Sequence, residues 1–154
     1  MKLFHNITIN VFIKEEEDYD KIKLYFLKLF PFNIKELIEK KKVRLNETKS
    51  STFNNKHNNN LDISLANNSL LNKFMENIKN NLSISDKSML LKQLDSRIDQ
   101  DCNLFMRLSK KDILDDEQYK IVDHGKCFHI KVHVATFPQS KEKAKQIIYD
   151  FFEN

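Results

Sequence analysis

Very few residues of this sequence have the type and spacing that metal binding or catalysis requires. His129 and His133 share one strand-like stretch, but on a strand they lie about 13 Å apart at ~3.3 Å per residue, too far to share one ion without a partner strand. Cys127 lies nearer to His129, yet this pair supplies only two ligands. The sequence therefore predicts that the protein holds no metal.

The remaining candidates for catalysis also lack partners. Cys102 is predicted to face the core, and Cys127 to lie at the edge of a hairpin. Neither cysteine is therefore placed as a nucleophile beside a histidine base. The acidic run DILDDE at 112–117 falls in a polar turn and lacks the spacing of a calcium loop. A chain with one glycine cannot build the phosphate-binding loops that need several. We therefore expect no enzyme and no cofactor.

Aromatic rings and cations occupy the outward positions of three alternating stretches, at 7–14, 102–110 and 128–137. Their inward positions are apolar apart from one cysteine. The outward residues are Phe12, Phe105, Arg107, His129, Lys131 and His133. If helices cover only the inward side, the outward side is an open face on which rings stack on bases and cations meet phosphates, which predicts RNA as the ligand. The alternative is that these residues are strand formers making ordinary cross-strand pairs.

A second basic segment lies early in the chain. The net charge is only +4, too small to demonstrate a nucleic-acid partner. Residues 1–60 hold 12 Lys or Arg against 8 Asp or Glu, whereas residues 61–154 hold 14 of each, so the excess lies in the first part. It gathers at KKKVR, residues 40–44. The candidate RNA contacts in this segment are Lys41, Lys42 and Arg44.

Amphipathic helices are predicted to position these strands. Glu15 to Asp20 place acid at the favourable end of a helix that Pro31 stops. Three further helices are predicted at 69–82, 85–98 and 140–152, with N-caps at Ser69, Ser85 and Ser140.

Additional strands are predicted at 41–48 and 61–66. Between them, residues 48–60 have the Ser/Asn composition of a flexible loop. The stretch 119–137 is predicted to be a hairpin that turns at DHGK, with the only glycine at its tip. At 154 residues, the chain is expected to be a single domain over 1–154. Its first residues contain no long apolar run, so we expect a cytosolic (cytoplasmic) protein without a membrane segment and with reduced thiols.

The second half of the sequence resembles a known family. Residues 94–138, LDSRIDQDCNLFMRLSKKDILDDEQYKIVDHGKCFHIKVHVATFP, are similar to the C-terminal half of an archaeal RNA-binding family described as predicted exosome subunits, and HNITINVFIKEEEDYDKIKLYFLKLF resembles its first strand and helix. Arg97 and Asp99 match the family's R-x-D, and Arg107 and Lys110 match the basic pair of its strand. Lys111 stands where a glutamine is usual, so it departs from the family pattern.

The resemblance implies an α+β fold with a largely antiparallel sheet backed by helices on one face, similar to the large-subunit ribosomal protein that holds the 5S RNA. It also implies a non-catalytic RNA-binding protein for structured or double-stranded RNA, associated with the exosome or the ribosome. Arg107 is expected to face the RNA and Lys110 to lie at the strand's end as a point charge for the phosphates. For Arg97, a structural ion pair with Asp99 or Asp95 stays open beside an RNA contact.

A second function remains open at this point. An open sheet face also suits a protein-interaction or scaffold domain that docks a protein partner or a second copy of itself, as a homodimer. The salt dependence of binding distinguishes the two functions. Affinity that rests on phosphate contacts falls steeply as the salt concentration rises, whereas the affinity of a docked apolar face is retained.

Overall fold

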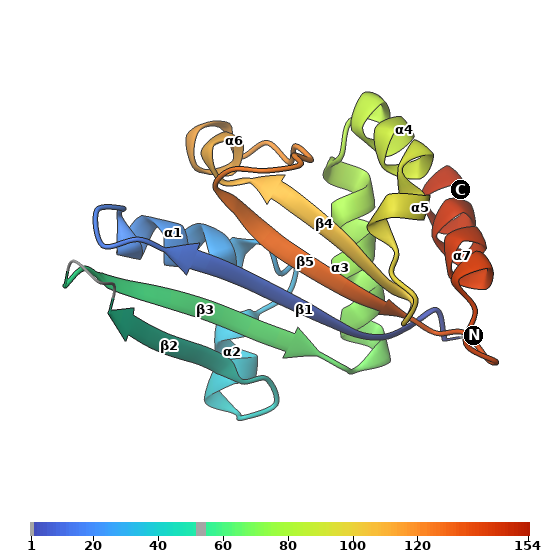
Figure 1. Cartoon of the computed structure of the whole chain (residues 1–154). Helices are drawn as coiled ribbons and strands as arrows, with labels where there is room; N and C mark the ends of the chain where they lie inside the picture. Colours follow the sequence, from blue (N-terminus) through green and yellow to red (C-terminus); the bar gives the residue numbers. More distant parts are fainter. Residues whose placement is uncertain (1, 52–54) are drawn as a thin grey trace.

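The computed structural model describes residues 2–51 and 55–154 of the chain. Its elements, in chain order, are β1 (Phe4–Ile13), α1 (Tyr19–Lys28), α2 (Ile34–Glu39), β2 (Leu45–Ser51), β3 (His57–Leu65), α3 (Asn68–Asn81), α4 (Ile84–Lys92), α5 (Leu94–Arg97), β4 (Asn103–Ser109), α6 (Lys110–Asp116), β5 (Cys127–Val134) and α7 (Lys141–Glu153). Together they form the α+β fold that the sequence predicts (Figure 1).

The strands form one antiparallel sheet in the order β2–β3–β1–β5–β4 (Figure 1). The register places Thr8 of β1 opposite Lys131 of β5, and Lys131 opposite Phe105 of β4. Side chains directly opposite one another in a sheet point to the same face. The outward positions of β1, β5 and β4 therefore share one face, as expected if the three alternating stretches present one open side.

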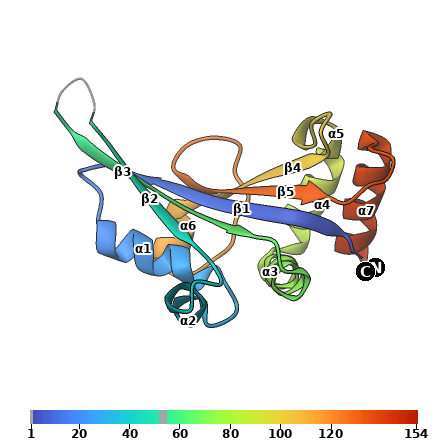
Figure 2. The ribbon, with the colours of Figure 1, turned by 90° about the horizontal axis from the view of Figure 1, so that it is seen from below.

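Helices pack on one side of the sheet. Figure 2 shows α1, α2, α3 and α6 below the strands, with α7 at one end and the short α5 beside β4. The inward positions are fully buried; Ile9, Ile63 and Ile130 of three neighbouring strands are each 0–1% exposed. Burying each such side chain contributes about 1.5–3 kcal/mol, so this layer is the main stabilising contact. Across the described residues, the opposite face of the sheet is left open.

Helix starts follow the capping chemistry predicted from the sequence, with small shifts. Ser140 caps α7 as expected, its Oγ accepting the Lys143 N–H. The caps of α3 and α4 lie two residues before the predicted ones: Asn67 accepts the Leu70 N–H and Ser83 accepts the Asp86 N–H. Each region offers two polar side chains, and the earlier one begins the helix, so the predictions at Ser69 and Ser85 are wrong by two residues.

The structure corrects the prediction of a loop at 48–60. Residues 48–51 continue β2, and residues 57–60 begin β3. Asn58 is buried, and its Oδ1 accepts the Glu15 N–H, which attaches the start of β3 to the end of β1. Ladder bonds to two neighbours override the weak strand propensity of asparagine. Of the predicted loop, residues 52–54 lie outside the described residues.

The predicted hairpin at 119–137 is also corrected. Its second arm is β5, but its first arm forms no regular strand. Residues 120–122 instead run along the outer edge of β4, where Ser109 N–H donates to Lys120 O at 2.8 Å and Val122 N–H donates to Arg107 O at 2.9 Å. This edge segment carries the chain past Arg107 and places Asp123 beside it. Over the described residues, the structure has no helix long and apolar enough to cross a membrane.

Candidate nucleic-acid interface

The cations and rings of the open face gather over β4 and β5. The register places Phe105 directly opposite Lys131, and Arg107 directly opposite His129. Phe105, Arg107 and Lys131 are exposed, and His129 is half-buried. One further pair along, His133 stands opposite Asn103. We call Phe105, Arg107, His129, Lys131 and His133 the cationic half of the face.

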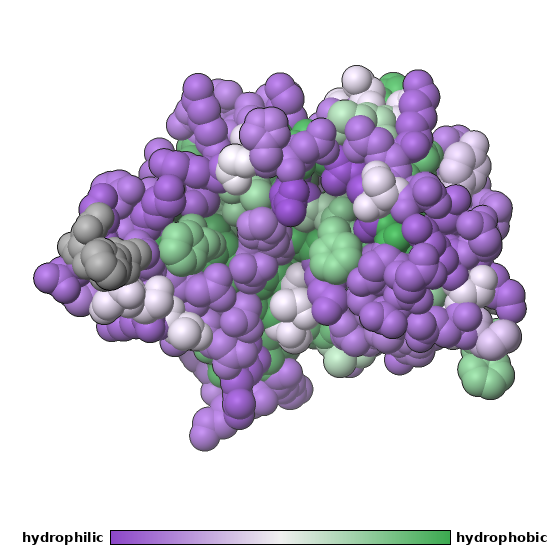
Figure 3. Space-filling model, in the orientation of Figure 1, coloured by the Kyte–Doolittle hydropathy of each residue, from purple (hydrophilic) through white to green (hydrophobic). Residues whose placement is uncertain are grey.

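Short polar side chains occupy the rest of the face, over β1, β3 and β2. They bond to one another across the strands: Thr8 Oγ1 lies 3.1 Å from Ser64 Oγ, Asn10 Nδ2 donates to Asn60 Oδ1 at 3.1 Å, and Asn46 Nδ2 donates to Asp62 Oδ1 at 3.0 Å. We call these six residues the amide half. In Figure 3, which views the open face, small apolar patches stand among mainly hydrophilic side chains.

A cleft opens at the outer edge of the cationic half. Its volume is about 490 Å³, and it is lined by Gln93, Ser96, Arg97, Phe105, Arg107 and Asp123. Arg97 Nη2 lies 2.7 Å from Asp123 Oδ1, and Arg107 Nη1 donates to the backbone carbonyl of Asp123. Two guanidinium groups therefore converge on Asp123, Arg97 on its carboxylate and Arg107 on its backbone carbonyl. We call this the arginine cleft.

The structure decides the partner of Arg97. Neither Asp99 nor Asp95 pairs with this arginine; the ion pair is with Asp123. Asp99 instead accepts the backbone N–H groups of Asp101 and Asn103, which holds the turn into β4. Burial raises the pKa of Asp99, but these hydrogen bonds outweigh it and leave the pKa below its usual value.

Burial and nearby charged groups lower the pKa of two histidines on the face. Burial lowers the pKa of His129, and the charges of Arg107 and Lys110 lower it further. Burial likewise lowers the pKa of His5, with a further decrease from His133, whose ring centroid lies 5.0 Å from that of His5. His129 is therefore mostly neutral at pH 7, and the permanent charges of this half belong to Arg107 and Lys131.

Lys110 does not occupy the place that the sequence analysis gives it. Its side chain is 5% exposed, and Nζ donates to Phe12 O at 2.8 Å and to both carboxylate oxygens of Glu17, at 3.1 and 3.2 Å. A lysine ammonium has three N–H groups, so these bonds use all of its donors. Sequence reasoning expected an exposed charge at the end of β4, whereas the chain turns into α6 there and folds this lysine inward.

The other basic residues predicted from the sequence lie away from the cationic half. Lys111 is exposed on α6, which lies on the helix side of the sheet (Figure 2). Lys41, Lys42 and Arg44 are exposed in the turn before β2, at the sheet edge opposite to β4. The structure therefore separates Lys41, Lys42 and Arg44 from Arg107 by the width of the sheet.

Phe12 lies beside a second, smaller cleft at the end of the face. This cleft measures about 280 Å³, and its charged lining consists of Lys14, Glu17, Lys110 and Lys126. The ring of Phe12 is 40% exposed, close to the 44% of Phe105. The two exposed rings thus mark two separate positions on one face.

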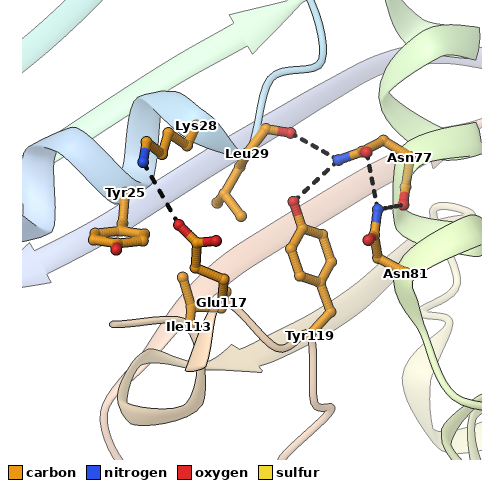
Figure 4. Close-up of a pocket in the computed structure, with 8 residues that line it drawn as sticks. All are labelled: Tyr25, Lys28, Leu29, Asn77, Asn81, Ile113, Glu117 and Tyr119. Atoms are coloured by element: carbon orange, nitrogen blue, oxygen red, sulfur yellow. Dashed lines mark hydrogen bonds and ion pairs between the residues drawn. The ribbon is translucent and has the colours of Figure 1, made fainter. Parts of the chain in front are cut away.

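A pocket of about 300 Å³ lies on the helix side (Figure 4), between α1, α3 and the segment after α6. Asn77 Nδ2 donates to Leu29 O and to Tyr119 Oη, and Lys28 pairs with Glu117 at 3.6 Å. Burial raises the pKa of Tyr119. These groups bond to one another and tie α1, α3 and the segment after α6 together.

In the part of the chain that the structure describes, the side chains form neither a metal site nor a reactive thiol site. No three His, Cys, Asp or Glu side chains come together there as metal ligands. Cys127 Sγ lies 3.5 Å from His129 Nε2, but burial raises the pKa of this thiol, which disfavours the reactive thiolate.

Comparison with known proteins identifies the family of this chain. A family profile described as RNA binding matches residues 6–134, a span that contains β2 to β5 and all of β1 except its first two residues. The chain belongs to this RNA-binding family. It is 25% identical over 149 residues to an RNA-binding protein of Pyrococcus abyssi, with 97% of this chain and 94% of that protein covered.

Solved structures support the fold. A DUF54 protein from Methanothermobacter thermautotrophicus aligns with a TM-score of 0.76 at 22% identity, over 97% of this chain and 98% of that one. A protein of the same group from Sulfolobus solfataricus gives 0.72 at 20% identity, over 95% and 98%. A UPF0201 protein from Methanococcus jannaschii gives 0.57 at 16% identity, over 93% and 92%. These structures share the fold of this chain, while the profile match and the Pyrococcus relative carry the archaeal RNA-binding family that the sequence resemblance indicates.

Sequence reasoning missed three residues of the arginine cleft, Gln93, Ser96 and Asp123. Asp123 falls in the predicted hairpin turn, and the other two lie within the predicted helix at 85–98. A signal for Gln93 exists, because it precedes Arg97 by one helical turn, and its Oε1 accepts the Arg97 Nε–H at 2.9 Å. Nothing local marks Asp123, whose position depends on the edge segment along β4.

Proposed function

We propose that the protein binds structured or double-stranded RNA without catalysis and that the cationic half of the open face is the contact surface. One observation carries the proposal: exposed Phe105 and Arg107 stand directly opposite Lys131 and His129, so a ring and permanent cations share one patch. Rings stack on bases, and cations neutralise phosphates.

The proposal assigns different roles to the basic residues. Arg107 and Lys131 contact the RNA, with His129, His133 and Phe105 around them and Arg97 at the edge. Phe12, Lys111, Lys41, Lys42 and Arg44 lie outside this patch and serve at most as distant contacts of a long RNA. Lys110 contributes to folding. Association with the exosome or the ribosome, and a fold similar to the ribosomal protein that holds 5S RNA, rest on the resemblance of residues 94–138 alone.

A charge-matched pair of variants tests the proposal. Arg107→Ala with Lys131→Ala removes two charges from the cationic half, and Lys41→Ala with Lys42→Ala removes two from the opposite edge. Affinity for an RNA hairpin is measured at about 50 and 200 mM salt. The first variant should bind more weakly and lose about one unit of salt slope per phosphate contact, while the second stays near the parent. Equal losses in both variants would show that only net charge matters.

Self-association through the open face is the alternative function. The exposed rings Phe12 and Phe105 are the observation that favours it. Sedimentation of the free protein distinguishes the two, since a dimer that persists at high salt and dissociates when RNA is added would place a second copy on this face.

A further inference from the structure

We propose that the arginine cleft receives one unpaired nucleotide of a structured RNA, with its base on Phe105 and its phosphate between Arg97 and Arg107. This inference rests on the proposed function and makes it more specific. It predicts that the protein binds RNA with an unstacked base more tightly than RNA that is paired throughout.

The size and lining of the cleft fit a single nucleotide. Its volume of about 490 Å³ falls within the roughly 300–1,000 Å³ of small-ligand sites. One wall is the ring of Phe105, which is 44% exposed although it is a large apolar side chain. An exposed ring in a half-open cleft suits a base that has left its stack, because every base has a face that stacks.

The charges of the cleft fit a phosphate. The side chain of Arg97 is 10% exposed, and its Nε is fixed by Gln93 while Nη2 is fixed by Asp123. Arg107 reaches the same residue through the Asp123 carbonyl. Among the described residues, the Asp123 carboxylate pairs with Arg97 alone, so the charge of Arg107 remains in excess in the cleft. A phosphate is the anion that Arg forks bind in a bidentate manner.

The amide of Gln93 supplies a group that can read a base edge. Its oxygen is used by Arg97, and within the described residues its Nε2 makes no hydrogen bond. A fixed amide donor at the wall of a cleft suits an acceptor on the Watson–Crick edge of an unstacked base. Paired bases hide that edge, so a duplex cannot make this contact.

Two RNAs and two ring variants test the proposal. The RNAs are a hairpin with one bulged adenosine and the same hairpin with a fully paired stem. The parent protein should prefer the bulged hairpin by about fivefold to tenfold, the lower part of what base–aromatic stacking contributes. Phe105→Ala should abolish that preference, whereas Phe12→Ala, which removes an equally exposed ring elsewhere on the face, should keep it.

A carboxylate variant adds a second readout. Asp123→Asn keeps an acceptor for Arg97 but removes the negative charge beside the phosphate, so the bulged hairpin should bind about twofold to fivefold more tightly at low salt. Equal binding of the two hairpins by the parent would overturn the cleft proposal and leave RNA binding intact. Loss of the preference in both ring variants would also overturn it. Failure of the parent to bind either hairpin would remove the proposed function itself.

Discussion

The two halves of the open face use polar side chains in opposite ways. In the amide half, the polar groups bond to one another across the strands, as Asn10 does with Asn60 at 3.1 Å. In the cationic half, Lys131 makes no hydrogen bond or salt bridge within the described part of the chain, and Arg107 bonds only a neutral backbone carbonyl there, so both charges lack a carboxylate partner. Both halves expose strands of the same sheet to solvent. The difference shows that exposure alone does not identify a binding surface, because polar groups that are already bonded have less to offer a ligand.

The largest effect is expected at Lys110, whose burial excludes it from the cationic half. Replacing it by Met leaves the Glu17 carboxylate partly buried without its partner, which costs about 3 kcal/mol of stability. The melting temperature should fall by roughly 10 °C. Calorimetry checks this, with exposed Lys111→Met as the control. Unchanged stability but weakened RNA binding would return Lys110 to the RNA surface.

Arg107 should give the largest effect on RNA affinity. Arg107→Ala removes a fork that both stacks and binds phosphate, so affinity should fall about tenfold, consistent with the 1–3 kcal/mol of such contacts. Arg107→Lys keeps the charge but loses the planar group, and about a threefold loss is expected. Fluorescence anisotropy at one salt concentration measures both, with Arg44→Ala as the matched arginine. An effect of Arg44→Ala equal to that of Arg107→Ala would erase the difference between the two sheet edges.

Acid should strengthen RNA binding modestly through His129. Its lowered pKa leaves it neutral at pH 7 in the free protein, and a nearby phosphate raises that pKa, so the complex holds more protons than its parts. Affinity should be flat from pH 8 to 7 and rise about twofold to threefold toward pH 5.5. His129→Gln should reduce the rise more than His57→Gln at the end of β3. A rise that both variants retain would exclude His129.

The lowered pKa of His129 has the opposite effect on the stability of the free protein, which acid should decrease. The unfolded chain takes up a proton on His129 near its usual pKa of 6.5, before the folded chain does. Stability contributed by the neutral ring is therefore complete above that pH and is lost as the pH falls below it. A thermal melt of the free protein against pH distinguishes this from the effect on RNA affinity.

The smallest effect on affinity is expected in the amide half. Asn10 shares a row of the sheet with His129 and Arg107, yet its amide bonds to Asn60. Asn10→Ala should change RNA affinity less than twofold while costing about 1 kcal/mol of stability for the lost hydrogen bond. Binding titrations beside urea unfolding test both values. A tenfold loss of affinity here would extend the RNA surface across β1.

The sequence predicts the open face well because it depends on local alternation. Inward Leu104 and Met106 fix the orientation of β4, and Phe105 and Arg107 must then point outward. Lys110 fails the same reasoning, because the strand ends at Ser109 and the periodicity ends with it. Its burial depends on Glu17, which is distant in sequence, and no local pattern reports such a partner.

The arginine cleft was beyond local reasoning for a similar cause. Arg97 is marked by the family resemblance, but its partner Asp123 arrives through an edge segment that bonds to β4 at a few positions only. The strand at 57–60 was missed because asparagine favours loops when isolated, whereas pairing on both sides makes it acceptable in the ladder.

The position of β1 in the sheet has a consequence for how the chain is made. This first strand lies between β3 and β5, and β5 begins only at Cys127. During synthesis, one edge of β1 therefore stays unpaired until most of the polypeptide has left the ribosome, and a chain cut short before that point exposes a strand edge beside an apolar layer. Truncated products should aggregate, and the last strand to emerge closes the centre of the sheet.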